Sequence, residues 1–388
     1  MASIVLKGIT WGHSRGITPL LAVSQRYMEL YPGVEIHWKK RTLQEFADMP
    51  IEKLCLDYDL LIIDHPWVGC AAATQCVLPL DKFIDAAYLK DQADHSVGDS
   101  HFSYGYGGSQ WALAIDAATP VASYRRDLLT DHHKSVPQTW EEVIALAKLG
   151  RIAVPAIPID LLMNFYTFCI AHGSEPFLQP GKVIDDETGT AALASMKELY
   201  SKIDPRFFQC NPIAVAELMS GTDNYWYCPF AYAYSNYSRK GYAAHLLKYT
   251  DVVRFGNARL RTTIGGTGLS VSASCKHPDT AVDFAMKAVS GEWQRSLYVQ
   301  NGGQPGHRSA WLDHDANRIT NDFFKQCLPV MENGYVRPRY NGYLHFQDHG
   351  GDPVQQFLLG NGTAKDVLQQ LNELYRNSVE PIDSKITV

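Results

Sequence analysis

Aromatic rings and small polar side chains are the residues of this chain whose types best suit a binding chemistry. A ring offers a flat apolar face for the C–H groups of a sugar, and carboxylate and amide groups offer fixed hydrogen-bond partners for its hydroxyls. The rings are Trp11, Trp67, Trp226, Tyr232 and Tyr234, and the polar partners are Asp64, Asp116, Asn164, Asn236 and Gln304. The alternative for each ring is packing, because aromatic side chains dominate any core.

Arginine side chains suggest a second chemistry. Arg15, Arg308 and Arg339 lie in or beside loops bounded by glycine or proline. A guanidinium binds a carboxylate through two parallel N–H bonds, and Arg15 with His13 precedes a predicted helix, whose N-terminus favours an anion. These residues predict a sugar acid or another carboxylate as ligand, and the alternative is a surface ion pair.

Other chemistries have weaker patterns. The histidines lack the H-E-x-x-H spacing of a zinc site, so we predict no metal and no cofactor. The eight cysteines never form C-x-x-C, which favours small buried side chains over a disulfide framework. There is no G-x-S-x-G elbow, phosphate-binding loop or full dinucleotide fingerprint. Two carboxylates such as Asp64 and Asp116 leave one enzymatic alternative, the hydrolysis of a glycoside.

The elements of the N-terminal part must position the first group of these residues. Strands are predicted at Ile4–Ile9, Val34–Trp38 and Asp59–Ile63, and helices at Ile17–Tyr31 and Thr42–Leu56. This order implies a parallel sheet whose strands bind ligands beyond their carboxyl ends. We therefore expect one wall of a site to contain Trp11, His13, Arg15, Asp64, His65 and Trp67.

The middle of the chain supplies a second wall. Strands are predicted at Leu113–Asp116, Val121–Tyr124 and Ile152–Ile157, and a helix at Leu161–Ala171. Further along, an aromatic run alternates rings with alanine, which in a strand places the rings on one face. The second wall is expected to contain Asn164, Phe165, Trp226, Tyr232, Tyr234 and Asn236.

The segment from Arg261 to Arg308 contains a glycine turn, an alternating strand from Leu269 to Ala273, a helix begun by Pro278 and a GGQPG turn. This order resembles the domain-crossing segment of the family 1 extracellular solute-binding proteins, the periplasmic receptors of ABC importers. Four more phrases resemble the family in the same order: Tyr31–Ile36, Asp59–Val68 with Leu78–Asp81, Trp111–Asp116 with Tyr124–Leu128, and Pro137–Glu142.

The resemblance implies an α/β fold of two lobes, the type II, maltose-binding-protein-like periplasmic-binding-protein fold. Each lobe would be a mainly parallel sheet flanked by helices. Lobe one would comprise residues 1–115 and 266–310, and lobe two residues 116–265 and 311–388, with hinge crossovers. Near the hinge we expect Asp116, Gly266, Thr267 and Gln304.

The implied function is a receptor that closes about its hinge on a carbohydrate or sugar acid and delivers it to a membrane permease. A non-sugar carboxylate is the alternative, and ferric ion bound by tyrosines is a further one. The net charge of −6 disfavours nucleic-acid partners, and we expect a monomer. The family implies a periplasmic or lipid-anchored extracellular location; the N-terminus lacks a leader pattern, which leaves a cytoplasmic location open.

Overall fold

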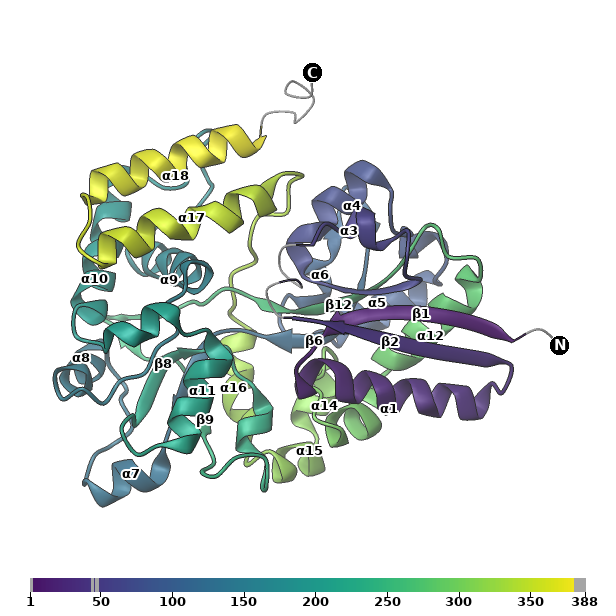
Figure 1. Ribbon diagram of the computed structural model, residues 1–388, viewed down its shortest axis with the longest axis horizontal. Coiled ribbons are helices and arrows are strands. Elements are labelled where there is room, and N and C mark those ends of the chain that lie inside the picture. Colours follow the sequence, from purple (N-terminus) through teal and green to yellow (C-terminus); the bar gives the residue numbers. More distant parts are fainter. Residues whose placement is uncertain (1–2, 43–44, 46–48, 380–388) are drawn as a thin grey trace. The chain divides into compact units, whose positions relative to one another are not determined.

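The computed structural model describes residues 3–42, 45 and 49–379. The chain forms two compact units, each built from three separate segments. Unit 1 comprises Met1–Thr119, Tyr234–Lys240 and Ile264–Asn341, and unit 2 comprises Pro120–Ala233, Gly241–Thr263 and Gly342–Val388. Figure 1 follows the chain through the elements of both units by colour.

Unit 1 contains a five-stranded sheet with the order β2-β1-β3-β12-β6. The strands are β1 (Ile4–Trp11), β2 (Val34–Arg41), β3 (Leu60–Ile63), β6 (Leu113–Ala118) and β12 (Gly265–Val271). β1 pairs in parallel with β2 and β3, and β12 runs antiparallel to both β3 and β6. The carboxyl ends of β1, β3 and β6 and the start of β12 therefore lie at one edge of the sheet.

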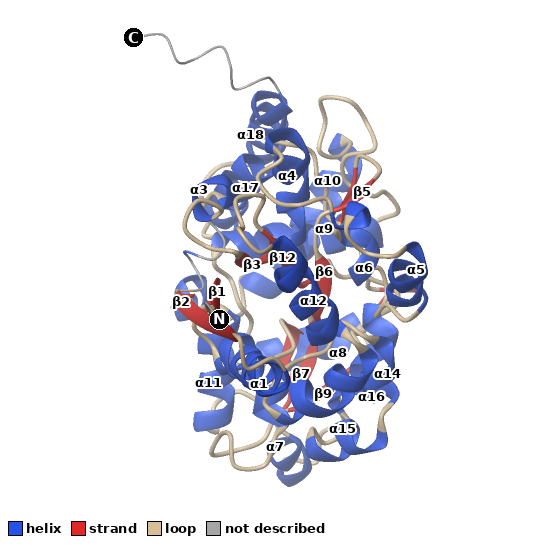
Figure 2. Cartoon of the chain, turned by 90° about the vertical axis from the view of Figure 1, so that its right-hand side faces the viewer, coloured by secondary structure: helices blue, strands red, loops and turns tan. Residues whose placement is uncertain are grey.

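Helices cover this sheet because each carries an apolar stripe. In α1 (Ser14–Leu30) the stripe contains Leu20, Val23 and Tyr27, and all three lie in the core of the unit. α12 (Pro278–Val289) packs on β12 and β6 (Figure 2). α1 begins earlier than predicted because the His13 imidazole caps it, accepting from the Arg15 N–H (3.0 Å).

The other elements of unit 1 are short helices and a hairpin. Of the helix predicted at Thr42–Leu56, residues 43–44 and 46–48 lie outside the described residues, and α3 forms its end. The elements are α3 (Ile51–Leu54), η1 (His65–Trp67), α4 (Val68–Thr74), η2 (Leu80–Lys82), α5 (Ala86–Asp94), α6 (Ser100–Ser103), β4 (Gly105–Tyr106), β5 (Ser109–Gln110), η4 (Ser235–Ser238), α13 (Gly291–Trp293), the π-helical turn η5 (Gln294–Tyr298), α14 (Arg308–Leu312), α15 (His314–Ile319) and α16 (Phe323–Met331).

Unit 2 has a smaller sheet with the order β8-β7-β9. β7 (Val121–Tyr124) pairs antiparallel with β8 (Tyr227–Ala231) and with β9 (Lys248–Thr250). The mainly parallel sheet expected here is thus wrong for these three strands. The strand predicted at Ile152–Ile157 is reduced to one parallel bridge between Ile152 and Tyr227.

Helices make up most of unit 2. α8 begins with a capping box, in which Thr139 and Glu142 satisfy each other's backbone N–H groups. The apolar helix α9 is buried along most of its length. The elements are α7 (Arg126–Asp131), α8 (Trp140–Lys148), α9 (Pro158–Ala171), α10 (Asp186–Tyr200), η3 (Pro205–Gln209), α11 (Pro212–Gly221), β10 (Arg254–Phe255), β11 (Ala258–Arg259), α17 (Tyr343–Leu358) and α18 (Ala364–Val379).

The boundaries of the units differ from the predicted lobes in two places. Residues 311–341 were assigned to lobe two, yet they belong to unit 1, where α15 and α16 pack on α14. The segment Tyr234–Lys240 also belongs to unit 1. The chain therefore crosses between the units once more in each direction than the sequence indicated.

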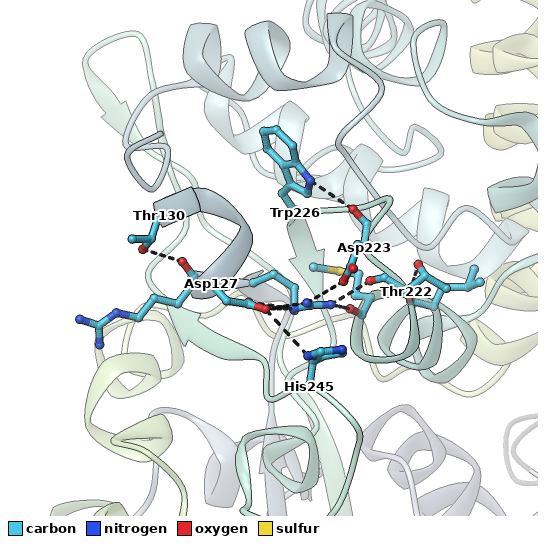
Figure 3. A network of polar contacts seen from close by, with 10 residues as sticks. Asp127, Thr130, Thr222, Asp223, Trp226 and His245 are labelled. Carbon is cyan, nitrogen blue, oxygen red and sulfur yellow. Dashed lines mark hydrogen bonds and ion pairs between the residues drawn. The ribbon is translucent and has the colours of Figure 1, made fainter. Parts of the chain in front are cut away.

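The buried guanidinium of Arg125 forms hydrogen bonds that connect two helices of unit 2. Arg125, at the start of α7, donates through Nη1 to the carbonyls of Met219 and Thr222 at the end of α11 (2.9 and 2.8 Å). Its Nη2 donates to Asp127 (2.6 Å) and Asp223 (2.9 Å). Figure 3 shows both aspartates in this network. The side chain of Arg125 is 1% exposed, whereas those of Asp127 and Asp223 are 48% and 71% exposed, so the guanidinium is buried while its two carboxylate partners reach water.

We expect Arg125→Met to lower the free energy of unfolding by about 2–3 kcal/mol, because the buried carbonyl of Met219 and the part-buried carbonyl of Thr222 lose a charged donor. Urea denaturation followed by circular dichroism measures this. The matched control is Asp223→Ala, because the Asp223 side chain is 71% exposed; its cost should stay below about 1 kcal/mol. Equal losses in the two variants would contradict a stabilising role of the buried carbonyl contacts.

Candidate functional site

Polar residues gather at one edge of the unit 1 sheet. Trp11 ends β1, Asp64 directly follows β3, and Asp116 lies near the end of β6. Thr267, near the start of β12, is the register partner of Asp116. The predicted meeting of these positions at the carboxyl ends of the strands follows from the sheet topology.

The first ion pair at this edge joins Arg15 to Asp116. The Nε of Arg15 donates to Oδ2 of Asp116 (2.9 Å), and Nη2 donates to Oδ1. Both residues are buried, with exposed fractions of 4% and 0%. Burial raises the pKa of the Asp116 carboxyl, and the Arg15 guanidinium opposes this rise. The two-pronged grip predicted for Arg15 exists, but its carboxylate belongs to the chain itself.

A second ion pair joins Asp64 to Arg337. The Nη2 of Arg337 donates to both carboxylate oxygens of Asp64 (2.7 and 2.8 Å) and lies 3.3 Å from the Nδ1 of His65. Burial alone would raise the pKa of Asp64, but Arg337 and the bond from His65 hold it well below its usual range. Burial and then the charge of Arg337 lower the pKa of His65 to about 4, so its imidazole is neutral at pH 7.

Tyr104 stands between the two pairs. Its ring lies edge-on to His65, with centroids 6.3 Å apart, and packs against Gly268, where an added Cβ would come within 2.6 Å of a ring carbon. Burial raises its pKa well above the usual value, and the charges of Asp64 and Asp116 add to the rise. Tyr104 therefore keeps its phenolic proton, and glycine at 268 is needed for its ring to fit.

Residues of the segment that follows β8 also contact this group of polar residues. The Tyr234 ring lies 4.6 Å from the His13 ring, and the Arg15 guanidinium lies over it at 4.9 Å. Gln304 accepts from the Ser235 N–H (3.2 Å) and donates to the Ala117 carbonyl (2.7 Å). Burial and then Arg15 lower the pKa of His13 to about 4.

Five buried side chains of this group have a polar atom without a hydrogen-bond partner among the described residues. They come from several segments of unit 1, with Ser235 and Asn236 both in η4, and none of the five atoms carries a charge at neutral pH. They are Nε2 of His65, the hydroxyl of Tyr104, Oγ of Ser235, Oδ1 of Asn236 and Oγ1 of Thr267. A buried polar atom is costly to the fold unless it has a hydrogen-bond partner. These five atoms are therefore the positions at which the hydroxyl groups of a ligand could form new hydrogen bonds.

Several predicted site residues, two of the first wall and two of the arginines, contact other parts of the chain itself. The Trp11 ring packs on Gly16 in the hydrophobic core, which agrees with the packing alternative, and Trp67 is buried at the end of η1. Arg308 pairs with Glu332 through Nε (2.8 Å). Arg339 donates to the carbonyls of Phe102 and Gly105 (2.7 and 2.6 Å).

Gly266 has φ of 96°, and an added Cβ would lie 2.3 Å from the Asp116 carbonyl oxygen. Only glycine combines this conformation with so close an approach to β6. Gly266 therefore acts at this edge through its backbone, by allowing β12 to pack closely against β6 beside Asp116.

The residues predicted for the second wall divide between the units. Tyr234 and Asn236 belong to unit 1, so their assignment to lobe two is wrong. In unit 2, Asn164 donates to the Tyr200 hydroxyl (2.8 Å), and Tyr232 has its hydroxyl 3.5 Å from that of Thr263. Phe165 is fully buried on α9.

Trp226 has a packing role in unit 2. It stacks on His132 with centroids 4.3 Å apart, and the Arg151 guanidinium lies over it at 4.9 Å. The indole N–H donates to the Asp223 carbonyl (3.3 Å; Figure 3). Both faces of the ring thus have partners from the chain itself.

Sequence reasoning missed Arg337, Tyr104 and Ser235. Arg337 follows Asp64 by 273 residues, and no local pattern pairs them. In the motif Arg337-Pro338-Arg339 only Arg339 was predicted as a ligand residue, and the assignment of residues 311–388 to the second lobe separated Arg337 from Asp64.

The family comparison decides the class of the protein. Residues 52–318, more than half of the chain, match the model of the bacterial extracellular solute-binding protein family. The chain belongs to this family. A sequence comparison of this solute-binding protein with curated proteins found no match.

Solved structures agree with the two-lobed fold. Maltose-bound MalE3 of T. maritima has a TM-score of 0.84 at 18% identity, over 97% of this chain and 100% of that one. A solute-binding protein of Agrobacterium radiobacter K84 in complex with ribitol has a TM-score of 0.80 at 20% identity, over 95% of this chain and 97% of that one. A solute-binding protein of Agrobacterium vitis S4 with bound D-mannitol has a TM-score of 0.78 at 15% identity, over 97% of this chain and 98% of that one. The maltose-binding-protein-like fold predicted from the sequence is thus confirmed.

Membership also settles the broad role. The family consists of extracellular solute receptors of ABC importers, so this protein is a receptor and not a glycoside-acting enzyme, and a periplasmic or extracellular location follows from the family. Within the described residues, no helix combines the length and apolar character needed to cross a bilayer.

Proposed function

We propose that this solute-binding protein captures a neutral sugar or polyol and delivers it to the permease of an ABC importer. The observation that carries the proposal is the charge balance at the edge of the unit 1 sheet. The guanidinium of Arg15 is already neutralised by Asp116, and that of Arg337 by Asp64. A solute carboxylate would have to displace a buried carboxylate of the chain to bind either arginine.

The unpartnered atoms of the same group favour hydroxyl ligands. The hydroxyls of Tyr104, Ser235 and Thr267 can each donate or accept, the Asn236 oxygen accepts, and neutral His65 can do either through its tautomers. A sugar or polyol hydroxyl also donates and accepts, so each of these atoms gains a partner without burying a charge. The solved structures with ribitol and mannitol lend support from proteins of the same fold.

The sugar acid and the non-sugar carboxylate predicted from Arg15 lose their main support, because the Arg15 fork faces Asp116. The family supports an importer permease as the partner. Hinge closure, the monomeric state and the contribution of unit 2 residues stay predictions from the sequence.

A thermal-shift panel tests the proposal. Maltose, ribitol, mannitol and tagatose are compared with gluconate and glucuronate, each at pH 7.5 in the same buffer. We expect one neutral compound to stabilise the protein, since a ligand at 100 times its Kd adds about 2.7 kcal/mol to the folded state. Stronger stabilisation by either acid than by every neutral compound of the panel would refute the neutral-solute proposal.

A variant tests whether the stabilising compound binds at this edge of the unit 1 sheet. Thr267→Val keeps the shape of the side chain and removes its hydroxyl, so it should lower the affinity for the stabilising compound by about 5- to 30-fold, equivalent to about 1–2 kcal/mol. Thr130→Val is the matched control, since Thr130 lies exposed on α7 in unit 2 and donates to the Arg126 carbonyl. If the Thr267→Val variant and the parent bound the compound equally tightly, Thr267 would not be part of the binding site.

A further inference from the structure

We propose that Asp91, His95 and His307 form a binding site for one divalent transition-metal ion on unit 1, beyond the proposed solute binding and independent of it. Each of the three side chains offers one ligand atom, and these atoms all lie within 4.8 Å of one another. The two rings are nearly parallel, at 11°, with centroids 5.1 Å apart. The sequence analysis missed the site because 212 residues separate His95 from His307 (307 − 95).

The backbone brings the three ligands together before any metal binds. Asp91 and His95 lie one turn apart at the end of α5, so their side chains share a face. The Arg308 N–H donates to the His95 carbonyl (2.7 Å), and Ser96 forms an antiparallel bridge with His307. Since this pairing fixes both histidine backbones, a metal ion would not have to order the chain.

The His307 ring is held in place by a helix cap. Its Nδ1 accepts from the Ser309 N–H (3.3 Å) at the start of α14 and lies 2.8 Å from the Ser309 hydroxyl. Metal binding through Nε2 requires the tautomer with the proton on Nδ1, which the Ser309 hydroxyl can then accept in place of the cap. Gly291 packs over the face of the same ring, where an added Cβ would come within 2.8 Å of Cε1 and 3.1 Å of Nε2. A side chain at position 291 would therefore displace the ring that supplies the ligand.

The donor set selects the class of ion. Two imidazoles and one carboxylate suit Zn²⁺, Ni²⁺ or Cu²⁺, whereas Mg²⁺ and Ca²⁺ prefer oxygen ligands. Zinc bonds of about 2.1 Å would bring the ligand atoms to about 3.5 Å from one another. The half-exposed side chains of Asp91 and His95 can move that far, while buried His307 stays in place. Three protein ligands leave a fourth position for water.

Isothermal titration of the full, tag-free chain with Zn²⁺ after chelator treatment tests the site. We expect saturable binding of one ion per chain, weakened at least tenfold in both Asp91→Asn and His95→Ala, in line with the roughly 10- to 100-fold effects of metal-site substitutions. Both changes are at exposed positions, so the variants should fold. Electron paramagnetic resonance of the Cu²⁺ form should show two coordinating nitrogens, and one in His95→Ala.

The control is His345→Ala. His345 and His349 form another close histidine pair, one turn apart on α17 of unit 2, with ring centroids 4.9 Å apart. Zn²⁺ affinity should be unchanged in this variant. Unsaturable uptake of Zn²⁺, unchanged affinity in His95→Ala, or a loss confined to His345→Ala would each overturn the proposal.

Discussion

Asp116→Ala should lower the free energy of unfolding by about 3–5 kcal/mol, because it removes the carboxylate that neutralises the buried Arg15 guanidinium. Arg15 is 4% exposed and Asp116 0%, so bulk water does not reach the charge that has lost its carboxylate. Urea denaturation at pH 7.5 measures the loss. The same variant should also lose affinity for the proposed solute, because the two-pronged contact that orients Arg15 is gone.

A double variant separates the missing partner from the missing side-chain volume. Arg15→Met combined with Asp116→Leu removes both charges and fills the space with apolar groups, so it should be more stable than Asp116→Ala alone. Asp315→Ala is the surface control, since Asp315 and Arg318 have side chains 74% and 64% exposed; it should cost less than about 1 kcal/mol. A double variant as unstable as the single one would show that packing, and not the buried charge, sets the loss.

Local pattern was enough to predict which residues lie at the carboxyl-end edge of the unit 1 sheet. Trp11, Asp64 and Asp116 each follow or end an apolar strand, and strand order then brings them to one edge. The helix starts at Thr139 and Pro278 were equally visible, because a cap and a proline act within one turn. These features depend on residues close together in the sequence.

Tertiary contacts between distant segments could not be predicted in this way. Nothing near Arg15 indicates that its partner is Asp116 rather than a ligand, and nothing near Asp64 points to Arg337. The short crossing at Tyr234–Lys240 also has no composition of its own, so its rings were assigned to the wrong unit. Each error concerns which charges and rings meet, which only the packed fold determines.

Stability should fall steeply between pH 6.5 and pH 4 because of His13 and His65. Both have pKa values of about 4 in the folded chain, lowered first by burial, against 6.5 when unfolded. In this window the unfolded chain binds protons that the folded chain does not, so stability is greatest above pH 6.5 and is lost as the pH falls. At pH 5 the loss is about 2 kcal/mol for each histidine.

Urea denaturation at pH 7 and pH 5 measures this loss for the parent and for two variants. The free energy of unfolding at pH 7 minus that at pH 5 should be about 2 kcal/mol smaller in His13→Gln than in the parent, and likewise in His65→Gln. Comparing each variant with itself cancels any cost of the substitution at pH 7. His101, His172, His307 and His345, whose pKa values burial also lowers, add a background of the same sign.

The carboxylate of Asp64 does not interfere in this window. Its pKa lies well below the usual range beside Arg337, so its contribution persists at pH 5 and is lost only in stronger acid. His314→Gln is the control, because the His314 side chain is 90% exposed, and its pH dependence should match that of the parent. If His65→Gln kept the full loss between pH 7 and pH 5, the imidazole beside Arg337 would have to be protonated already in the folded protein, and the neutral hydrogen-bonding edge inferred for the solute would carry a positive charge.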